Sequence, residues 1–271
     1  KSLVTFFLLT FALTWTSWFA AAAVSGSFGA GVPALAELQT PLIYLGIFAP
    51  AIVAIALTAR AEGRAGVQAL LRRLFHWQVG GRWYVFALGY MAAIKLTVAL
   101  LHRIAMGEWP RFGQEAWYLM VGATILSVIV GGQTGEEIGW RGYALPGLAA
   151  RMGLAPASVL LGVIWASWHL PLFYILGGDT VGQSFPLYLL QVTALSVAIA
   201  WLYAHTNGSL LLTMLLHSAV NNTKDIVPSV VTGATKPFGL STSLVAWMTL
   251  ALLWICAAYF LARMPKFEDL A

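Results

Sequence analysis

Two adjacent carboxylates, Glu136 and Glu137, lie inside an apolar stretch, and Arg141 follows one helical turn later. On a helix, Glu137 and Arg141 are four residues apart, in the order that favours an ion pair, whereas Glu136 points about a quarter turn away. Charged side chains persist in apolar surroundings mainly when they are paired or serve a site. We therefore expect Glu136 to be the carboxylate left for chemistry. The alternative is that both glutamates are solvated at a helix end.

Two further apolar stretches carry the other polar groups of interest. His169 lies well inside one of them, and the next helical turn is disturbed by Pro171. His217 and Asn221 lie four residues apart in another stretch and share one helical face. Taken singly, each of these patterns also fits ordinary hydrogen bonding between packed helices.

The composition indicates the class of protein. Hydrophobic residues make up 60% of the chain and charged residues 9%, whereas a soluble domain carries about 25% charged residues. The sequence therefore predicts an all-α integral membrane protein. In such chains lysine and arginine chiefly set orientation against the anionic leaflet, so the net charge of +5 does not indicate a nucleic-acid partner, and we expect none.

The organisation expected is a single polytopic domain over residues 1–271 with eight transmembrane helices and both termini in the cytoplasm. The latter follows from the basic cluster between Arg60 and Arg82, because cytoplasmic loops are enriched in lysine and arginine. The segment from Gly66 to Trp77 has helical apolar spacing and is expected to be an amphipathic helix on the inner membrane surface. Each span approaches the ~20 residues needed to cross a bilayer; the spans are 3–24, 41–59, 83–104, 116–140, 155–176, 184–204, 208–223 and 241–262.

The polar residues are expected at a similar depth. At about 1.5 Å per residue, Glu136 lies roughly 10–20 Å from the inner boundary, His169 about 20 Å and His217 about 15 Å. Buried polar groups need partners. We therefore expect these side chains, with Asn221, to face one another across an intramembrane polar cavity.

Three motifs, in their order along the chain, resemble those of a known family. They are Glu-Glu-x-x-x-Arg at 136–141, aromatic-x-x-x-His at 165–169 and His-x-x-x-Asn at 217–221. Their order on three spans within residues 116–224 resembles the CAAX protease and bacteriocin-processing family of intramembrane proteases, which includes the type II CAAX prenyl endopeptidases. The commonest family form has phenylalanine where this chain has Trp165, which we interpret as a packing position.

The resemblance implies a role for each motif residue. Glu136 is implied to be the catalytic carboxylate, and His169 to help it position and deprotonate a water. His217 and Asn221 are implied to bind the scissile carbonyl and stabilise the oxyanion, with Glu137 and Arg141 as the supporting pair. A buried carboxylate is a stronger base, and fixed donors at a developing charge supply a large catalytic effect. A zinc enzyme remains an alternative, with Glu136, His169 and His217 as its ligands, although we favour a metal-free site.

The expected function is thus an intramembrane endopeptidase of the plasma membrane of a bacterium, surrounded by lipid. Its substrate is expected to be a lipidated or membrane-anchored protein, or a peptide, cut near its C-terminus. Two alternatives stay open. A proton- or ion-coupled transporter would use Lys95, Glu136 and the histidines as a pathway, and a non-catalytic immunity protein of the same fold would not need Glu136.

Overall fold

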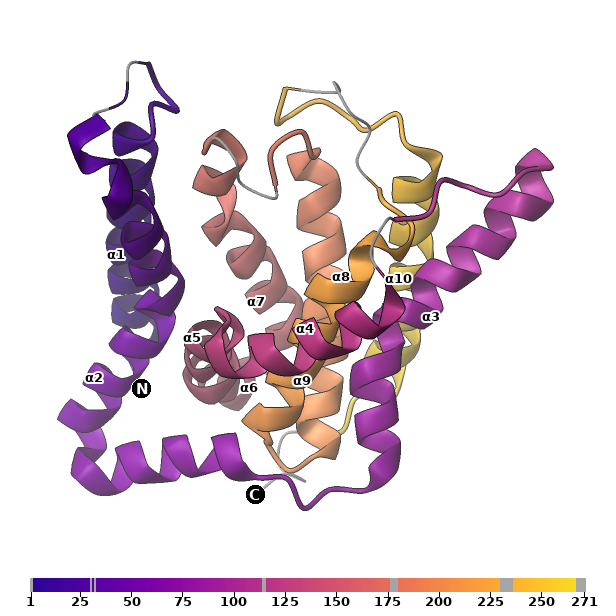
Figure 1. Ribbon diagram of the computed structural model, residues 1–271. Coiled ribbons are helices and arrows are strands. Elements are labelled where there is room, and N and C mark those ends of the chain that lie inside the picture. Colours follow the sequence, from indigo (N-terminus) through magenta and orange to yellow (C-terminus); the bar gives the residue numbers. More distant parts are fainter. Residues whose placement is uncertain are drawn as a thin grey trace.

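The computed structural model describes residues 2–29, 31, 33–113, 116–175, 180–229 and 236–266, and within these ranges every regular element is a helix (Figure 1). The prediction of an all-α protein is confirmed there. Short 3-10 helices occupy Pro33–Leu38, Arg73–Phe75, Leu170–Tyr174 and Lys224–Ile226, and a π-helix occupies Ile138–Ala144. The α-helices are α1 (Leu3–Val24), α2 (Gln39–Arg72), α3 (Gly81–Met106), α4 (Trp117–Val130), α5 (Gln133–Glu137), α6 (Leu145–Met152), α7 (Leu154–Trp168), α8 (Phe185–His205), α9 (Leu210–Thr223) and α10 (Leu244–Ala262).

Six helical segments of the described chain are long and apolar enough to cross a membrane, and a bent pair of helices raises the number to seven. The protein is therefore a multi-pass membrane protein. Helix α9 has 14 residues and a length of about 21 Å, which is shorter than the ~30 Å hydrocarbon core. Eight complete spans thus remain a prediction. The start of α1 and the end of α10 lie toward the same side of the molecule (Figure 1), while their cytoplasmic placement stays a prediction.

The expected single span over 116–140 is instead a broken helix. Helix α4 ends at Val130, the backbone of Gly131 is extended (φ −83°, ψ 171°), and α5 starts at Gln133. Two consecutive glycines permit this interruption because they have little preference for helical geometry. The two arms differ in direction by 48°, and α4 packs against α9 (Figure 1). The break places Glu136 near the start of a second helical arm, Gln133–Met152, in which α5 continues through the π-helix into α6.

Helix α2 bends at Gly63, whose φ of +64° is a conformation that favours glycine. The following segment runs across one end of the bundle (Figure 1), in the region expected to form an amphipathic surface helix. Its Leu70 is buried against the protein, and Phe75 and Trp77 are exposed. The apolar face was expected to contact lipid, yet part of it covers the helix bundle, because Leu70 meets the small residue Gly142.

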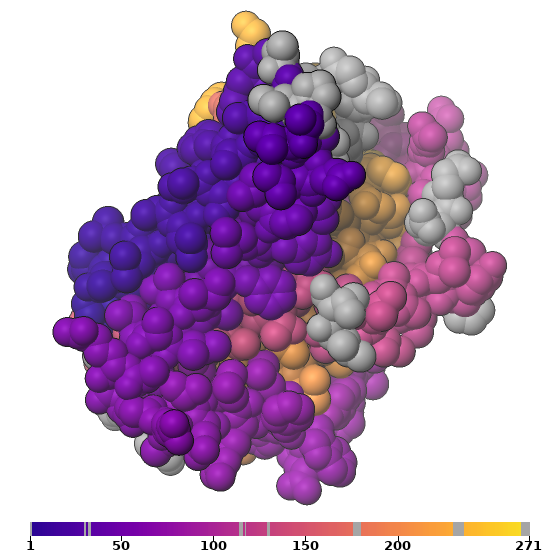
Figure 2. Space-filling view, turned by 60° about the vertical axis from the view of Figure 1, so that its left-hand side comes forward, coloured from indigo at the N-terminus to yellow at the C-terminus, as the bar shows by residue number. Residues whose placement is uncertain are grey.

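Helices α1 and α2 pack closely together, and α1 contacts the end of α7. A Cβ at Gly46 would lie 2.2 Å from the indole nitrogen of Trp18, so only glycine allows this approach. Thr14 donates to the carbonyl of Gly46 (2.9 Å) and accepts from the indole N–H of Trp168 on α7 (2.8 Å). In the space-filling view, α1 and α2, indigo to purple, form the near wall of the molecule (Figure 2). This wall borders the cavity described below.

Gly135 and Gly139 set the position of the carboxylates against α2. A Cβ at Gly135 would lie 2.9 Å from Phe48 Cα, and a Cβ at Gly139 would lie 2.7 Å from the carbonyl oxygen of Pro50. Small residues four apart let two helix backbones approach closely in membrane proteins. Glu136 and Glu137 therefore stand on a segment that is fixed against α2 and directed toward α7 and α9.

Candidate active site

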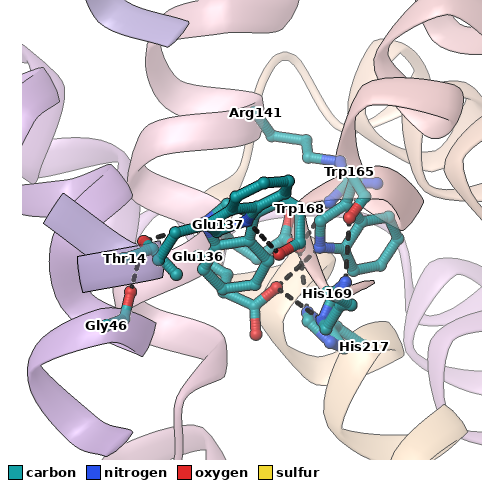
Figure 3. A network of polar contacts seen from close by, with 10 residues as sticks. Thr14, Gly46, Glu136, Glu137, Arg141, Trp165, Trp168, His169 and His217 are labelled. Atoms are coloured by element: carbon teal, nitrogen blue, oxygen red, sulfur yellow. Dashed lines mark hydrogen bonds and ion pairs between the residues drawn. The ribbon is translucent and has the colours of Figure 1, made fainter. Parts of the chain in front are cut away.

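All four residues expected to be catalytic line one cavity of about 260 Å³ between α2, α5, α7, α8 and α9. These residues are Glu136, His169, His217 and Asn221, and Figure 3 shows the first three with their polar partners. The structure thus brings together groups separated by up to 85 residues in the chain, from position 136 to position 221. The depth of this cavity in the bilayer stays a prediction.

Glu136 is buried, with 7% of its surface exposed. Its Oε2 accepts a hydrogen bond from the indole N–H of Trp165 (2.6 Å) and lies 3.8 Å from Nε2 of His169. The latter distance is longer than a hydrogen bond and leaves the two groups as neighbours at the cavity wall. Glu136 is therefore held apart from the ion pair of Glu137 and Arg141, as the sequence predicted.

The end of α7 gives His169 its orientation. The last turn tightens, so that the backbone N–H of His169 donates to Ala166 rather than to Trp165. The carbonyl of Trp165 instead meets Nδ1 of His169 at 2.8 Å. Pro171, which has no N–H, follows at the start of a 3-10 helix. If Nδ1 carries the proton, Nε2 presents a lone pair on the side of Glu136.

Glu137 organises a second group of charges. It is fully buried, and its Oε1 accepts from Nη1 of Arg141 (2.7 Å) and contacts Nδ1 of His217 (3.0 Å). The Arg141 guanidinium also lies over the Trp165 ring, 4.3 Å from its centroid. The predicted pair of Glu137 and Arg141 is thus present, and His217 joins it as a third member. A carboxylate bound to Nδ1 orients the ring and directs Nε2 elsewhere.

Asn221 lies one helical turn beyond His217 and is an exposed residue of the cavity wall. Its neighbour Asn222 has a different environment, since its amide donates to Ser127 of α4 and to the carbonyl of Ser218. Asn222 therefore joins α9 to α4, while Asn221 is available to a molecule in the cavity.

The donor set does not match the zinc alternative. His169 lies beside Glu136, whereas His217 contacts Glu137, so the two imidazoles address different carboxylates. Within the part of the chain that the structure describes, no three histidine, cysteine, aspartate or glutamate side chains converge to hold a metal ion. A site with Glu136, His169 and His217 as ligands would require these side chains to rearrange.

Two residues have contacts that the sequence reasoning did not identify. Trp165 was interpreted as a packing position, yet it donates to Glu136; the tendency of buried indoles to find a partner is the signal that points to this. For Lys95 the sequence predicts a part only in the transporter alternative. It is 1% exposed, and its Nζ donates to the carbonyl of Val227 (3.0 Å), to Ser229 (2.7 Å) and to Thr249 (3.2 Å).

Comparison with known proteins agrees with the motifs. The family described as "Type II CAAX prenyl endopeptidase Rce1-like" matches residues 114–223, a range that holds all three motifs. A curated protein of Methanococcus maripaludis, named CAAX prenyl protease 2, is 25% identical over 232 residues, which cover 82% of this chain and 83% of that protein. The matched range holds all three motifs whose polar residues lie around one cavity, and by both comparisons this chain is similar to the type II CAAX prenyl endopeptidases.

Proposed function

We propose that this protein is an intramembrane endopeptidase in which Glu136 activates a water molecule. The observation that supports this most is the arrangement around one cavity, where a carboxylate and an imidazole lie side by side and a second imidazole and an amide lie on α9. A general base needs a proton-accepting group within hydrogen-bond reach of water, and Glu136 and His169 together supply one.

The reaction follows from these groups. Glu136 takes a proton from water as the oxygen attacks the scissile carbonyl carbon, and His169 orients that water. The carbonyl π electrons move to the oxygen, and the oxyanion is stabilised by donors from His217 and Asn221. When the tetrahedral intermediate collapses, the C–N bond breaks and Glu136 returns the proton to the leaving amine. The products are a new C-terminal carboxylate and a released peptide.

The contact between Glu137 and His217 supports an orientation of the imidazole for this step. Nδ1 of His217 faces a carboxylate oxygen that Arg141 also binds, so Nδ1 is expected to carry a proton. Nε2, on the other side of the ring, is then the nitrogen proposed to meet the oxyanion. In this proposal the second glutamate, Glu137, holds Nδ1 of His217 and so directs Nε2 of the ring away from Glu137.

The proposed substrate is a membrane-anchored or lipidated protein, or a peptide, cleaved near its C-terminus. Two observations support this: the cavity is enclosed by helices of a multi-pass membrane protein, and the relatives are prenyl endopeptidases by name. Residence in the plasma membrane of a bacterium is part of the same proposal.

A cleavage assay tests the proposal. Purified protein in lipid vesicles is given a farnesylated peptide ending in a CAAX sequence, and the released tripeptide is measured by mass spectrometry. Wild-type protein should release it, and Glu136→Gln should not. In cells that carry Glu136→Gln, an uncleaved substrate should accumulate. Full function of Glu136→Ala protein would instead favour the non-catalytic immunity protein.

The transporter alternative has less support in the structure. Lys95 does not line the cavity and makes three hydrogen bonds to the segment after α9 and to α10. It therefore does not extend an ion pathway from Glu136.

A further inference from the structure

The hydrogen bond between Trp165 and Glu136 is short. The indole N–H meets Oε2 at 2.6 Å, which is short for a bond between nitrogen and oxygen and is characteristic of bonds to charged groups. Phenylalanine, the residue that the commonest family form carries at this position, has no such donor. The hydrogen bond is therefore a property of this chain's own side chain.

The surroundings of Trp165 fix its ring. The side chain is buried, with Arg141 over one part of the ring at 4.3 Å and the His217 ring edge-on at 5.1 Å and 83°. Its carbonyl holds Nδ1 of His169. Trp165 thus contacts both groups that are proposed to activate water, Glu136 through its indole and His169 through its backbone (Figure 3).

We propose that Trp165 is a positioning residue for Glu136. Its N–H holds Oε2 in place, so that Oε1 is the oxygen that takes the proton from water and later returns it to the leaving amine. A carboxylate that rotates freely would sample few orientations suited to proton transfer, and fixed groups avoid that loss. This inference rests on the proposed function, because it assigns a role relative to the proposed base.

The test removes the N–H while keeping the ring. One variant is Trp165→Phe, and a second carries benzothienylalanine at position 165, in which sulfur replaces the indole N–H. The matched control is Trp140→Phe, since the Trp140 indole is fully buried and has no hydrogen-bond partner among the described residues. All are assayed with the farnesylated CAAX peptide in lipid vesicles, with kcat and KM determined separately and Tm measured.

We expect kcat to fall about 10- to 100-fold in both position-165 variants, as for the loss of one hydrogen bond to a charged group. KM should stay near the wild-type value, because the Glu136 carboxylate that Trp165 positions acts on water and does not bind substrate. The Tm of the benzothienylalanine variant should match that of wild type. Trp140→Phe should keep the wild-type kcat.

Two results would overturn the inference. Wild-type kcat in the benzothienylalanine variant would show that the N–H has no role and that only ring packing matters. A rise in KM with unchanged kcat would place Trp165 in substrate binding instead. Glu136→Gln is run in parallel: if it is inactive while the benzothienylalanine variant is fully active, the role of Trp165 fails and the proposed function stands. If Glu136→Gln cleaves at the wild-type rate, the proposed function itself fails.

Discussion

Replacement by glutamine should have different effects at the two adjacent glutamates. At Glu137 it should lower the stability of the protein, whereas at Glu136 it should abolish hydrolysis. Glu137 and Arg141 are both fully buried and joined at 2.7 Å. Glu137→Gln leaves the Arg141 charge without its partner, and removing one member of a buried ion pair costs about 3–5 kcal/mol. With about 2–4 °C lost per kcal/mol for a chain of this size class, Tm should fall by roughly 6–20 °C.

Glu136→Gln should leave stability close to wild type. Among the described residues Glu136 forms no ion pair with a lysine or arginine, and the amide oxygen of glutamine remains an acceptor for the Trp165 indole. The expected change in the free energy of unfolding is below about 1 kcal/mol, the difference between a charged and a neutral acceptor. Hydrolysis should nevertheless stop, since an amide takes no proton from water.

The two variants are compared in the same detergent by thermal unfolding and by cleavage of the farnesylated peptide. Arg141→Gln in the Glu137→Gln background serves as the control, because removing the orphaned charge should restore part of the lost stability. Equal losses of Tm in Glu136→Gln and Glu137→Gln would refute the assignment of one carboxylate to structure and the other to chemistry.

Three further predictions follow from the packing and the donor set. Lys95→Met should lower the free energy of unfolding by about 1–2 kcal/mol, because the carbonyl of Val227 loses its donor; the turnover rate of the folded protein should not change, and a loss of turnover with intact Tm would give Lys95 a functional role. Gly139→Ala should cost about 1–3 kcal/mol and reduce cleavage, because its Cβ would overlap Pro50. The control is Gly89→Ala, where a Cβ meets nothing within 4 Å, and equal Tm values for the two would contradict the close packing on α2. Dialysis against a zinc chelator should leave the cleavage rate unchanged, and recovery of a lost rate by added zinc would establish a metal enzyme.

Local spacing in the sequence accounts for much of the fold and of the site. The apolar composition predicts the membrane class, and apolar stretches predict most helices to within a few residues, as for α1 at Leu3–Val24. The ion pair of Glu137 and Arg141 also follows from spacing, because residues four apart on a helix are neighbours. The break at Gly131 was missed, although paired glycines signal it.

Contacts between distant segments were decided only by tertiary structure. Nothing in the sequence indicates that His217 binds Glu137, 80 positions away, or that the Trp165 indole reaches Glu136, 29 positions away. These partners depend on the axial position of α5 relative to α2. The close contacts of Gly135 and Gly139 with α2 fix that position. Periodicity in the sequence predicts which face of a helix is buried, whereas the register between two packed helices depends on the shapes of both. The sequence therefore predicted which residues could do chemistry, and the tertiary structure decided how they pair.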